Sequence, residues 1–415
     1  MGEELGMGRV GSARDRGLLF AGRALRMFSY GFLAIVLTLY LKELGFSEKK
    51  IGLLLTLTLF GDIPISLFLT THADRLGRRL TLVAGAGLML LAGAVFVMTG
   101  DFYLLAAAAT VGVISPSGYE VGPFLAVEQA ALSEVVGDAS RTKVFAWYNL
   151  TGTLATAVGS LAGGELSSVL QGAGWSPLEA YRAILSGYAG MGLVMAGLFL
   201  VLSAGVEANL KQAAGPVKSL LGLHKSRKRV LGLSSLFALD ALGGGFVVQG
   251  IIVLWFHTKY GVSDSSLGRV FFGANVLAAA SALSASWLAG KIGLVRTMVF
   301  THLPSNVLLM LVPFMPNVSL AIAMLMVRYT ISQMDVPARQ SYTMAVVEPD
   351  ERSAAAGVTG VARSVGAMLA PSIAGAMLAV PALMAGPFVV GGGLKIVYDL
   401  LLYRSFKMVR PPEET

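Results

Sequence analysis

The chain has 415 residues, of which 55% are hydrophobic and only 13% are charged, and its formal net charge is +8. Because a soluble domain carries about 25% charged residues, this composition excludes an ordinary soluble protein. Cysteine is absent, which excludes disulfide bonds and thiolate metal sites, and the four histidines are scattered without metal-ligand spacing. The composition is typical of a helical protein that crosses a membrane many times.

Apolar segments long enough to cross a bilayer recur along the whole chain. We predict an all-α membrane protein with twelve transmembrane helices, at residues 17–44, 50–73, 79–99, 102–135, 143–168, 180–204, 230–257, 265–289, 296–315, 318–346, 353–378 and 382–406. The first segment is too long for a cleaved signal peptide, so we expect it to be retained. The fourth and tenth are long for one crossing, so we expect them either to protrude into the cytoplasm or to bend at Pro116, Pro123 and Pro337.

Lysine and arginine are concentrated in the loops on one side of these helices, including the segment 205–229 with its cluster HKSRKR. Since such residues favour the cytoplasmic side, we predict that both termini lie in the cytoplasm. The chain then divides into a six-helix bundle at 1–204, a cytoplasmic linker at 205–229 and a second six-helix bundle at 230–415. This topology accounts for the positive charge, so we expect no nucleic-acid partner. We also expect a monomer in the plasma membrane that contacts lipid.

The two bundles share short sequence matches in the same order. The stretch ALRMFSYGF (24–32) matches ALDALGGGF (238–246), and GFSEKKIG (45–52) matches GVSDSSLG (261–268). Further on, ADRLGRRL (73–80) matches AGKIGLVR (289–296), and EQAALSEVV (128–136) matches RQSYTMAVV (339–347). Four matches between equivalent helices predict that the second bundle is a parallel repeat of the first.

The most specific motif is DRLGRR at residues 74–79, between the second and third helices. It resembles the G-x-x-x-D-R-x-G-R-R signature of the major facilitator superfamily, with Thr70 in place of the leading glycine. Glu134 and Arg141 similarly resemble the family's E-x6-R pattern, and the likeness extends over the whole chain. The resemblance implies two six-helix bundles that move a solute by alternating access. The signature is similar to that of proton-coupled drug and metabolite exporters.

Charged residues gather where the helices meet the cytoplasm, and we expect their ion pairs across the two bundles to close the inner mouth. Exposed ion pairs are worth about 0–1 kcal/mol each, which suits a reversible gate. The alternative is a basic loop that merely obeys the topology. The predicted gate consists of Asp74, Arg75, Gly77, Arg78, Arg79, Glu128, Glu134, Arg141, Arg339 and Arg352.

Other charged residues lie inside the apolar segments, where exposing one to lipid would cost about 2.5–3.5 kcal/mol. They must therefore face one another or a water-filled cavity. In the repeat, Asp240 takes the place of Arg26 and Arg339 takes the place of Glu128, each with its charge reversed. By resemblance the first and seventh helices line the central cavity, so Arg26 and Asp240 can meet or share a ligand. The predicted substrate and proton cavity consists of Arg23, Arg26, Tyr30, Asp62, Glu120, Asp240, Arg328 and Arg363.

In the functional hypothesis, Asp240 or Asp62 binds the coupling proton while Arg26 engages the solute, and the alternative is a static salt bridge. Lys395 and Asp399, four residues apart, are expected to pair along their own helix. His302 is expected to pack around a kink rather than to bind a metal.

Three classes of function can be weighed against these features. The first is a secondary transporter without cofactor or metal, which exports an amphipathic compound against protons or, alternatively, transports an organic or inorganic anion. The second is a membrane-embedded enzyme, but the chain has no H-E-x-x-H, G-x-S-x-G, P-loop or G-x-G-x-x-G motif. The third is a channel or receptor-like protein, which the acids able to carry protons disfavour. We therefore predict a transporter of a small-molecule solute with H⁺ as coupling ion.

Overall fold

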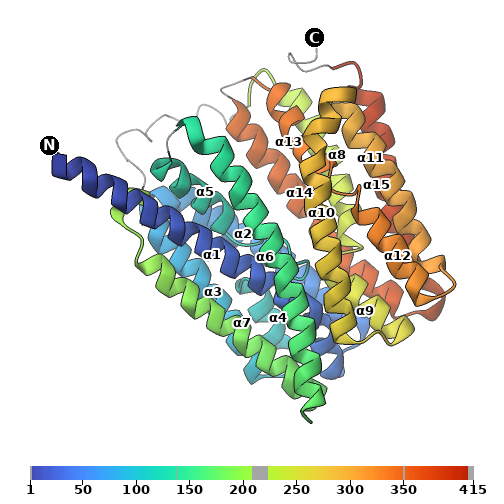
Figure 1. Cartoon of the computed structure of the whole chain (residues 1–415). Coiled ribbons are helices and arrows are strands. Elements are labelled where there is room, and N and C mark those ends of the chain that lie inside the picture. The colour runs from blue at the N-terminus through green and yellow to red at the C-terminus, as the bar shows by residue number, and fades with distance from the viewer. Residues whose placement is uncertain (1, 137, 208–222, 349–350, 410–415) are drawn as a thin grey trace. The chain divides into compact units, whose positions relative to one another are not determined.

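The computed structural model describes residues 2–136, 138–207, 223–348 and 351–409, and these residues are mostly helical (Figure 1). They group into two compact units. Unit 1 holds the described residues of Met1–Gly45, Leu57–Gly215 and Ser263–Phe272. Unit 2 holds those of Phe46–Thr56, Pro216–Val262 and Gly273–Thr415.

The helices of the first half of the chain are α1 (Gly2–Glu43), α2 (Glu48–Leu76), α3 (Arg78–Met98), α4 (Phe102–Val111), α5 (Phe124–Val135), α6 (Asp138–Gly172), α7 (Pro177–Leu200) and the 3-10 turn η1 (Ala204–Val206). Those of the second half are α8 (Arg227–Gly245), α9 (Gln249–Tyr260), α10 (Asp264–Ile292), α11 (Leu294–Leu311), η2 (Val312–Phe314), α12 (Val318–Tyr329), α13 (Asp335–Ala345), α14 (Arg352–Leu378), η4 (Pro381–Leu383) and α15 (Gly386–Phe406).

Nine helical segments in the described ranges are long and apolar enough to cross a membrane on their own, with α8 and α9 counted together as Arg227–Tyr260. Helix α6 and the two pairs α4–α5 and α12–α13 supply three further crossings. The structure thus confirms the predicted twelve-helix membrane fold.

Both long segments are broken rather than extended. The fourth crossing is non-helical at residues 112–123, and the tenth is interrupted at residues 330–334. Of the two alternatives expected from the sequence, the structure thus shows bending, close to the prolines, which cannot donate a backbone hydrogen bond inside a helix. Pro116 lies in the first break, Pro123 is the N-cap of α5, and Pro337 sits in the first turn of α13.

Side-chain caps mark where several helices begin. The carboxylate of Asp101 accepts hydrogen bonds from two backbone N–H groups of α4, each at 3.0 Å. Ser176 and Glu179 form a capping box at the start of α7, and the Asn317 side chain accepts the Leu320 N–H at 2.9 Å before α12. Such caps satisfy donors that a helix cannot satisfy by itself.

The packing inside the two units follows the same scheme. In unit 1, α1 packs on α6 and α7, and α3 packs on α7. In unit 2, the corresponding helix α8 packs on α14 and α15, and α11 packs on α15. Both sets join the first, third, fifth and sixth crossings of a half. This repetition agrees with the parallel repeat expected from the sequence matches.

Glycine allows the closest of these contacts. A Cβ on Gly31 of α1 would overlap the carbonyl of Thr156 on α6, and a Cβ on Gly245 of α8 would overlap the carbonyl of Ala367 on α14. Gly31 and Gly245 match in the first sequence repeat. Small residues bring two backbones close enough for van der Waals packing within a membrane. In both halves, a glycine contact of this kind positions the first crossing against the fifth.

Candidate functional site

The break in the fourth crossing places an acidic side chain among arginines. Gly118 (φ +70°) and Gly122 (φ +83°) adopt backbone conformations that favour glycine. Three hydrogen bonds hold the break in place. The Gly122 N–H donates to Asp62 at 2.6 Å, the Tyr30 hydroxyl donates to the Val121 carbonyl at 3.0 Å, and the Ser115 hydroxyl donates to the Tyr119 carbonyl. Glu120 lies between these fixed points.

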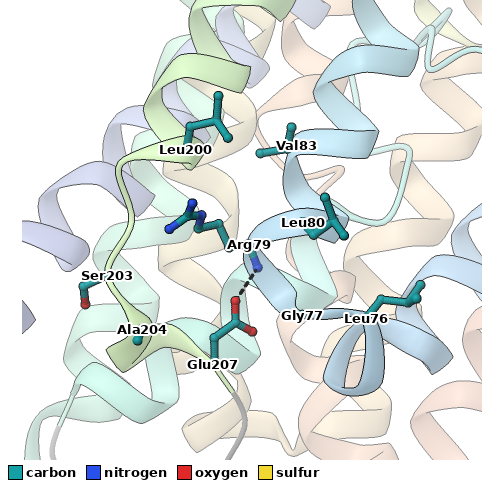
Figure 2. A pocket seen from close by; sticks show the side chains of 9 residues that line it. All are labelled: Leu76, Gly77, Arg79, Leu80, Val83, Leu200, Ser203, Ala204 and Glu207. Atoms are coloured by element: carbon teal, nitrogen blue, oxygen red, sulfur yellow. Dashed lines mark hydrogen bonds between the residues drawn. The ribbon is translucent and has the colours of Figure 1, made fainter.

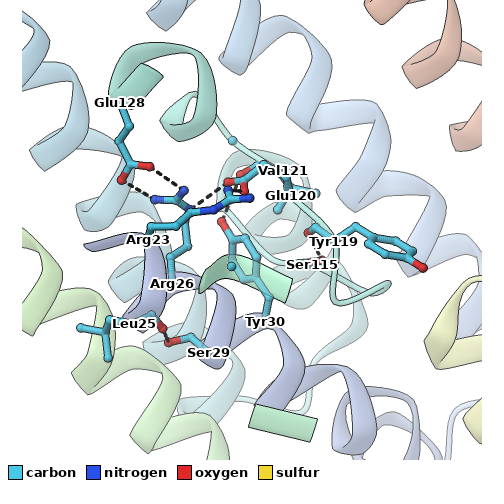
Figure 3. A network of polar contacts seen from close by, with 12 residues as sticks. Arg23, Leu25, Arg26, Ser29, Tyr30, Ser115, Tyr119, Glu120, Val121 and Glu128 are labelled. Carbon is cyan, nitrogen blue, oxygen red and sulfur yellow. Dashed lines mark hydrogen bonds and ion pairs between the residues drawn. The ribbon is translucent and has the colours of Figure 1, made fainter. Parts of the chain in front are cut away.

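A first ion cluster forms around Glu120 in unit 1 (Figure 3). Arg26 donates from Nη1 and Nη2 to the two oxygens of Glu128, at 2.5 and 2.7 Å, and from Nε to Glu120 at 2.8 Å. Arg23 pairs with the other oxygen of Glu120, and the Tyr148 hydroxyl donates to Glu128. Two arginines thus face two carboxylates, which neutralises the cluster.

The two carboxylates of this cluster are held differently. The side chain of Glu128 is 0% exposed and lies on a regular helix, where it accepts a two-pronged bond from Arg26 and a further bond from Tyr148. Glu120 is 17% exposed and lies on non-helical backbone. Two-pronged arginine–carboxylate bonds are among the strongest charge-assisted contacts in proteins. Glu128 is therefore the more firmly held of the two carboxylates.

A second ion cluster surrounds Asp240 in unit 2. One oxygen of Asp240 accepts from Arg339 on α13 at 2.9 Å, and the other accepts from Lys395 on α15 at 2.6 Å. Arg339 also pairs with Asp335 at 3.3 Å. His302 on α11 brings its Nε2 to 3.7 Å from Asp240. Side chains from three other helices thus converge on the buried carboxylate of α8.

His302 links Asp240 to a further acid. Its Nδ1 lies 2.9 Å from Asp399, and Asn306, one turn along α11, donates to the second oxygen of Asp399 at 3.1 Å. The expected roles of these residues were wrong in two respects. Lys395 binds Asp240 rather than Asp399, and His302 is a hydrogen-bonded member of the cluster rather than packing at a kink. The spacing of His302 and Asn306, one turn apart, was the signal that could have revealed them.

The two clusters are related by the sequence repeat. Glu128 is four residues after the start of α5, and Arg339 is four residues after the start of α13. In unit 1 the first crossing supplies the cation, Arg26, and the broken helix supplies the acid. In unit 2 the signs are reversed, since Asp240 is on the first crossing and Arg339 on the broken helix. Both discontinuous helices thus bring an ionic partner to the first crossing of their unit.

Arg26 and Asp240 each bind partners inside their own unit rather than one another. The expectation that they share a ligand stays a prediction. Asp62 likewise accepts hydrogen bonds from Ser66 and Gly122 in unit 1. Tyr30 and Arg23 lie in the Arg26 cluster, as their spacing along one helical face predicts.

Two predicted cavity arginines lack an acidic partner among the described residues. Arg363 on α14 makes no hydrogen bond or ion pair there, although it lies within electrostatic reach of Arg339, Asp240 and Asp335. Arg328, in the last turn of α12, is buried, and its guanidinium lies over the ring of Tyr329 at 5.1 Å. The Nε of Arg328 has no hydrogen-bond partner in the described part of the chain.

Comparison with known proteins decides the family. The model of the major facilitator superfamily matches residues 19–371. The chain belongs to the major facilitator superfamily. It is 31% identical to the uncharacterized membrane protein YJR124C of Saccharomyces cerevisiae, over 95% of this chain and 94% of that protein.

Solved structures of superfamily members share the fold at low sequence identity. A structure of the nucleoside transporter NupG is 13% identical with a TM-score of 0.77, over 94% of this chain and 100% of that chain. A bacterial homologue of the lysosomal transporter Spinster is 15% identical with a TM-score of 0.72, over 94% and 96% of the two chains. The superfamily and its fold identify a secondary transporter rather than an enzyme.

The superfamily signature forms a compact polar cluster within unit 1. Arg78 pairs with Asp74 at 2.8 Å and with Glu134 of α5 at 3.3 Å. Its Nη1 also reaches the carbonyls of Ala130 and Val206, at 3.3 and 3.2 Å. The signature thus ties together α2, α3, α5 and the segment that follows α7.

The start of α3 is completed by a residue outside the motif (Figure 2). Gly77 is its N-cap with φ +98°, and the next two backbone N–H groups, of Arg78 and Arg79, donate to the Glu207 carboxylate at 2.6 and 3.2 Å. A carboxylate at a helix N-terminus satisfies free donors and opposes the helix dipole. Glu207 lines a pocket of about 270 Å³ with Arg79 and Leu200. No local pattern indicates the role of Glu207, because its partners lie more than a hundred residues away in the chain.

The remaining gate residues are dispersed. Glu128 and Arg339 lie in the two ion clusters, and their assignment to the gate stays a prediction. Arg75 is exposed, and Arg352 donates to the Met344 carbonyl at 3.0 Å. The side chain of Arg141 lies outside the described residues.

Proposed function

We propose that the protein is a proton-coupled secondary transporter that moves a small solute across the cell membrane by alternating access, with both termini in the cytoplasm. The observation that supports proton coupling is the environment of Asp240. This carboxylate is buried, and its two oxygens are shared between cations on different helices, Arg339 and Lys395.

A buried carboxylate stays charged at low cost only while its partners remain in place. Breaking a buried ion pair by removing one partner costs about 3–5 kcal/mol, because an uncompensated charge is left behind. If a conformational change draws Arg339 or Lys395 away, uptake of a proton neutralises Asp240 and removes this penalty. The helices that carry the cations thus couple the protonation of Asp240 to movement.

Of the two solute classes that the sequence leaves open, the geometry favours an organic anion over an exported amphipathic compound without a negative charge. Arg23, Arg328 and Arg363 all have unused capacity. The Nε atoms of Arg23 and Arg328 are buried and make no hydrogen bond to any described residue. Arg363 forms no ion pair with any described residue. Guanidinium groups suit planar carboxylates, which they bind through parallel hydrogen bonds.

A ligand screen followed by transport assays tests this proposal. Purified protein in detergent is first tested for thermal stabilisation by organic anions, organic cations and neutral amphiphiles. The stabilising compound is then used in proteoliposomes with an imposed pH gradient. We expect an organic anion to stabilise the protein and to accumulate along with proton movement.

Asp240→Asn should abolish accumulation driven by the pH gradient but spare exchange of solute for solute. Glu165→Gln is the matched control, since Glu165 forms an exposed ion pair with Arg269. Unchanged pH-driven accumulation in Asp240→Asn would rule out a coupling role for Asp240. Stabilisation by cations or neutral amphiphiles alone would favour the exporter of an amphipathic compound.

A further inference from the structure

The cluster in unit 1 has an excess of cationic hydrogen-bonding capacity once its fixed members are set aside. Arg26 and Glu128 bind one another through two parallel bonds. Arg23 then adds a second positive charge, and the acid that balances it is Glu120. The site therefore needs one negative charge from a group that is not fixed by a regular helix.

The backbone that carries Glu120 differs from that of the other members. Arg23 and Arg26 lie on α1 and Glu128 on α5, whereas Glu120 lies in the break at residues 112–123. The break is held by single hydrogen bonds at neighbouring residues, each worth about 1 kcal/mol. Withdrawing the side chain of Glu120 thus requires no helix to unwind.

The guanidinium of Arg23 is buried and retains unused hydrogen-bonding capacity. Arg23 is 6% exposed, and its Nε makes no hydrogen bond within the described residues. Gly152 on α6 lets this guanidinium pack directly against the helix backbone, because a Cβ there would lie 2.6 Å from the Nε. The guanidinium also lies over the ring of Tyr148 at 5.1 Å, and that of Arg26 over Phe124 at 4.7 Å. The site is an arginine pair in an aromatic setting.

We propose that Arg23 and Arg26 form the binding site for a carboxylate group of the solute. In the absence of solute the carboxylate of Glu120 occupies this site, and the solute displaces it on binding. The inference rests on the proposed function in taking the ligand to be a transported solute. The exchange conserves charge, since one carboxylate replaces another beside Glu128. The ligand class is a monocarboxylate with an apolar or aromatic body.

Chemical rescue tests the site directly. Glu120→Ala removes the carboxymethyl group of the side chain, which corresponds to acetate. Propionate is one methylene longer and brings the same carboxylate, so it should enter the vacated position and pair with Arg23. In the full-length protein in detergent, we expect Glu120→Ala to lower the thermal midpoint and propionate to restore it. A hydrogen bond to a charged group is worth about 1.5–3 kcal/mol, so the half-saturating propionate concentration should be at least about ten-fold lower for the variant than for the wild type.

Three controls separate a built site from general effects. Propionamide has nearly the same shape without the charge and should not rescue Glu120→Ala. Arg23→Gln combined with Glu120→Ala should lose the rescue. Glu165→Gln should respond to propionate as the wild type does. Equal rescue by propionamide, rescue that persists without Arg23, or equal responses of the variant and the wild type would each overturn the proposal.

A labelling measurement serves if Glu120→Ala does not fold. The chain has no cysteine, so Tyr119→Cys gives a single thiol beside Glu120, at a position that is 51% exposed. Displacement of Glu120 should change the rate of its reaction with N-ethylmaleimide when propionate is added, but not when propionamide is added. A rate unaffected by propionate would contradict displacement. Both measurements are made at equilibrium without a gradient, so their outcome is independent of whether Asp240 couples transport to protons.

Discussion

Arg26 and Glu128 join the first crossing of unit 1 to its broken helix through two parallel hydrogen bonds, of 2.5 and 2.7 Å. Both side chains are completely buried. The equivalent positions of unit 2 hold Asp240 and Arg339, which pair at 2.9 Å with the charges exchanged. Both halves thus have an ion pair at this place, but the helix that carries the cation in one half carries the acid in the other. The same link would keep a discontinuous helix attached to the first crossing in each half.

Removing both members of the Arg26–Glu128 pair should cost less stability than the two single removals added together. Glu128→Gln leaves a buried guanidinium without its main partner, and we expect a loss of about 3–5 kcal/mol in stability. With Arg26→Gln added, the total loss should fall short of the sum of the two single losses by about 0.5–3 kcal/mol. Unfolding of the three variants in detergent checks this. Losses that simply add would show that the two residues contribute independently.

The space beside Arg23 should tolerate no additional methyl group. Gly152→Ala would place a Cβ against the Arg23 guanidinium, so we expect it to shift this group and to lower stability by about 1–3 kcal/mol, as overpacking does. The matched control is Gly190→Ala on α7, where a Cβ would meet no atom within 4 Å. In the control, alanine should be neutral or stabilising by up to about 1 kcal/mol. Similar thermal midpoints for both variants would contradict the crowding at Gly152.

The stability supplied by Glu351 should depend on pH. Glu351 precedes α14, and its carboxylate accepts the backbone N–H groups of His224 and Ser226 next to α8. Burial by itself would raise the pKa of Glu351, but hydrogen bonds from Ser226 and from the two backbone amides outweigh it and lower the pKa from 4.5 to about 2. The folded state thus favours the ionised form, and its contribution is complete above pH 4.5 and lost as the pH falls toward 2.

Glu351→Gln should therefore lower the thermal midpoint at neutral pH, and the gap to the wild type should narrow as the pH falls from 4.5 to 3. Glu348→Gln, which changes an exposed acid three residues away, should leave the midpoint unaltered throughout. A gap that stays constant down to pH 3 would mean that the ionised carboxylate is not what holds the start of α8.

Several features of the fold could be predicted because they depend on local composition or periodicity. Hydropathy located the twelve crossings, and the excess length of the fourth and tenth, with their prolines, indicated where they bend. The repeat also showed that Arg26 corresponds to Asp240 and Glu128 to Arg339. These predictions needed no knowledge of which helices touch.

The partners of the buried charges could not be predicted in this way. The repeat led us to expect that Arg26 and Asp240 would meet or share a ligand. Helical spacing led us to expect that Lys395 would pair with Asp399. The structure instead pairs Arg26 with Glu120 and Glu128, and Lys395 with Asp240.

The sequence by itself determined how many helices this protein has and which charges must be buried, since each follows from the cost of placing polar groups in hydrocarbon. The tertiary structure alone decided which charges meet. Arg26 and Glu128 are 102 residues apart in the chain, and their contact depends on how the break at residues 112–123 returns α5 toward α1. Many residues share in fixing that path, and no local pattern records it.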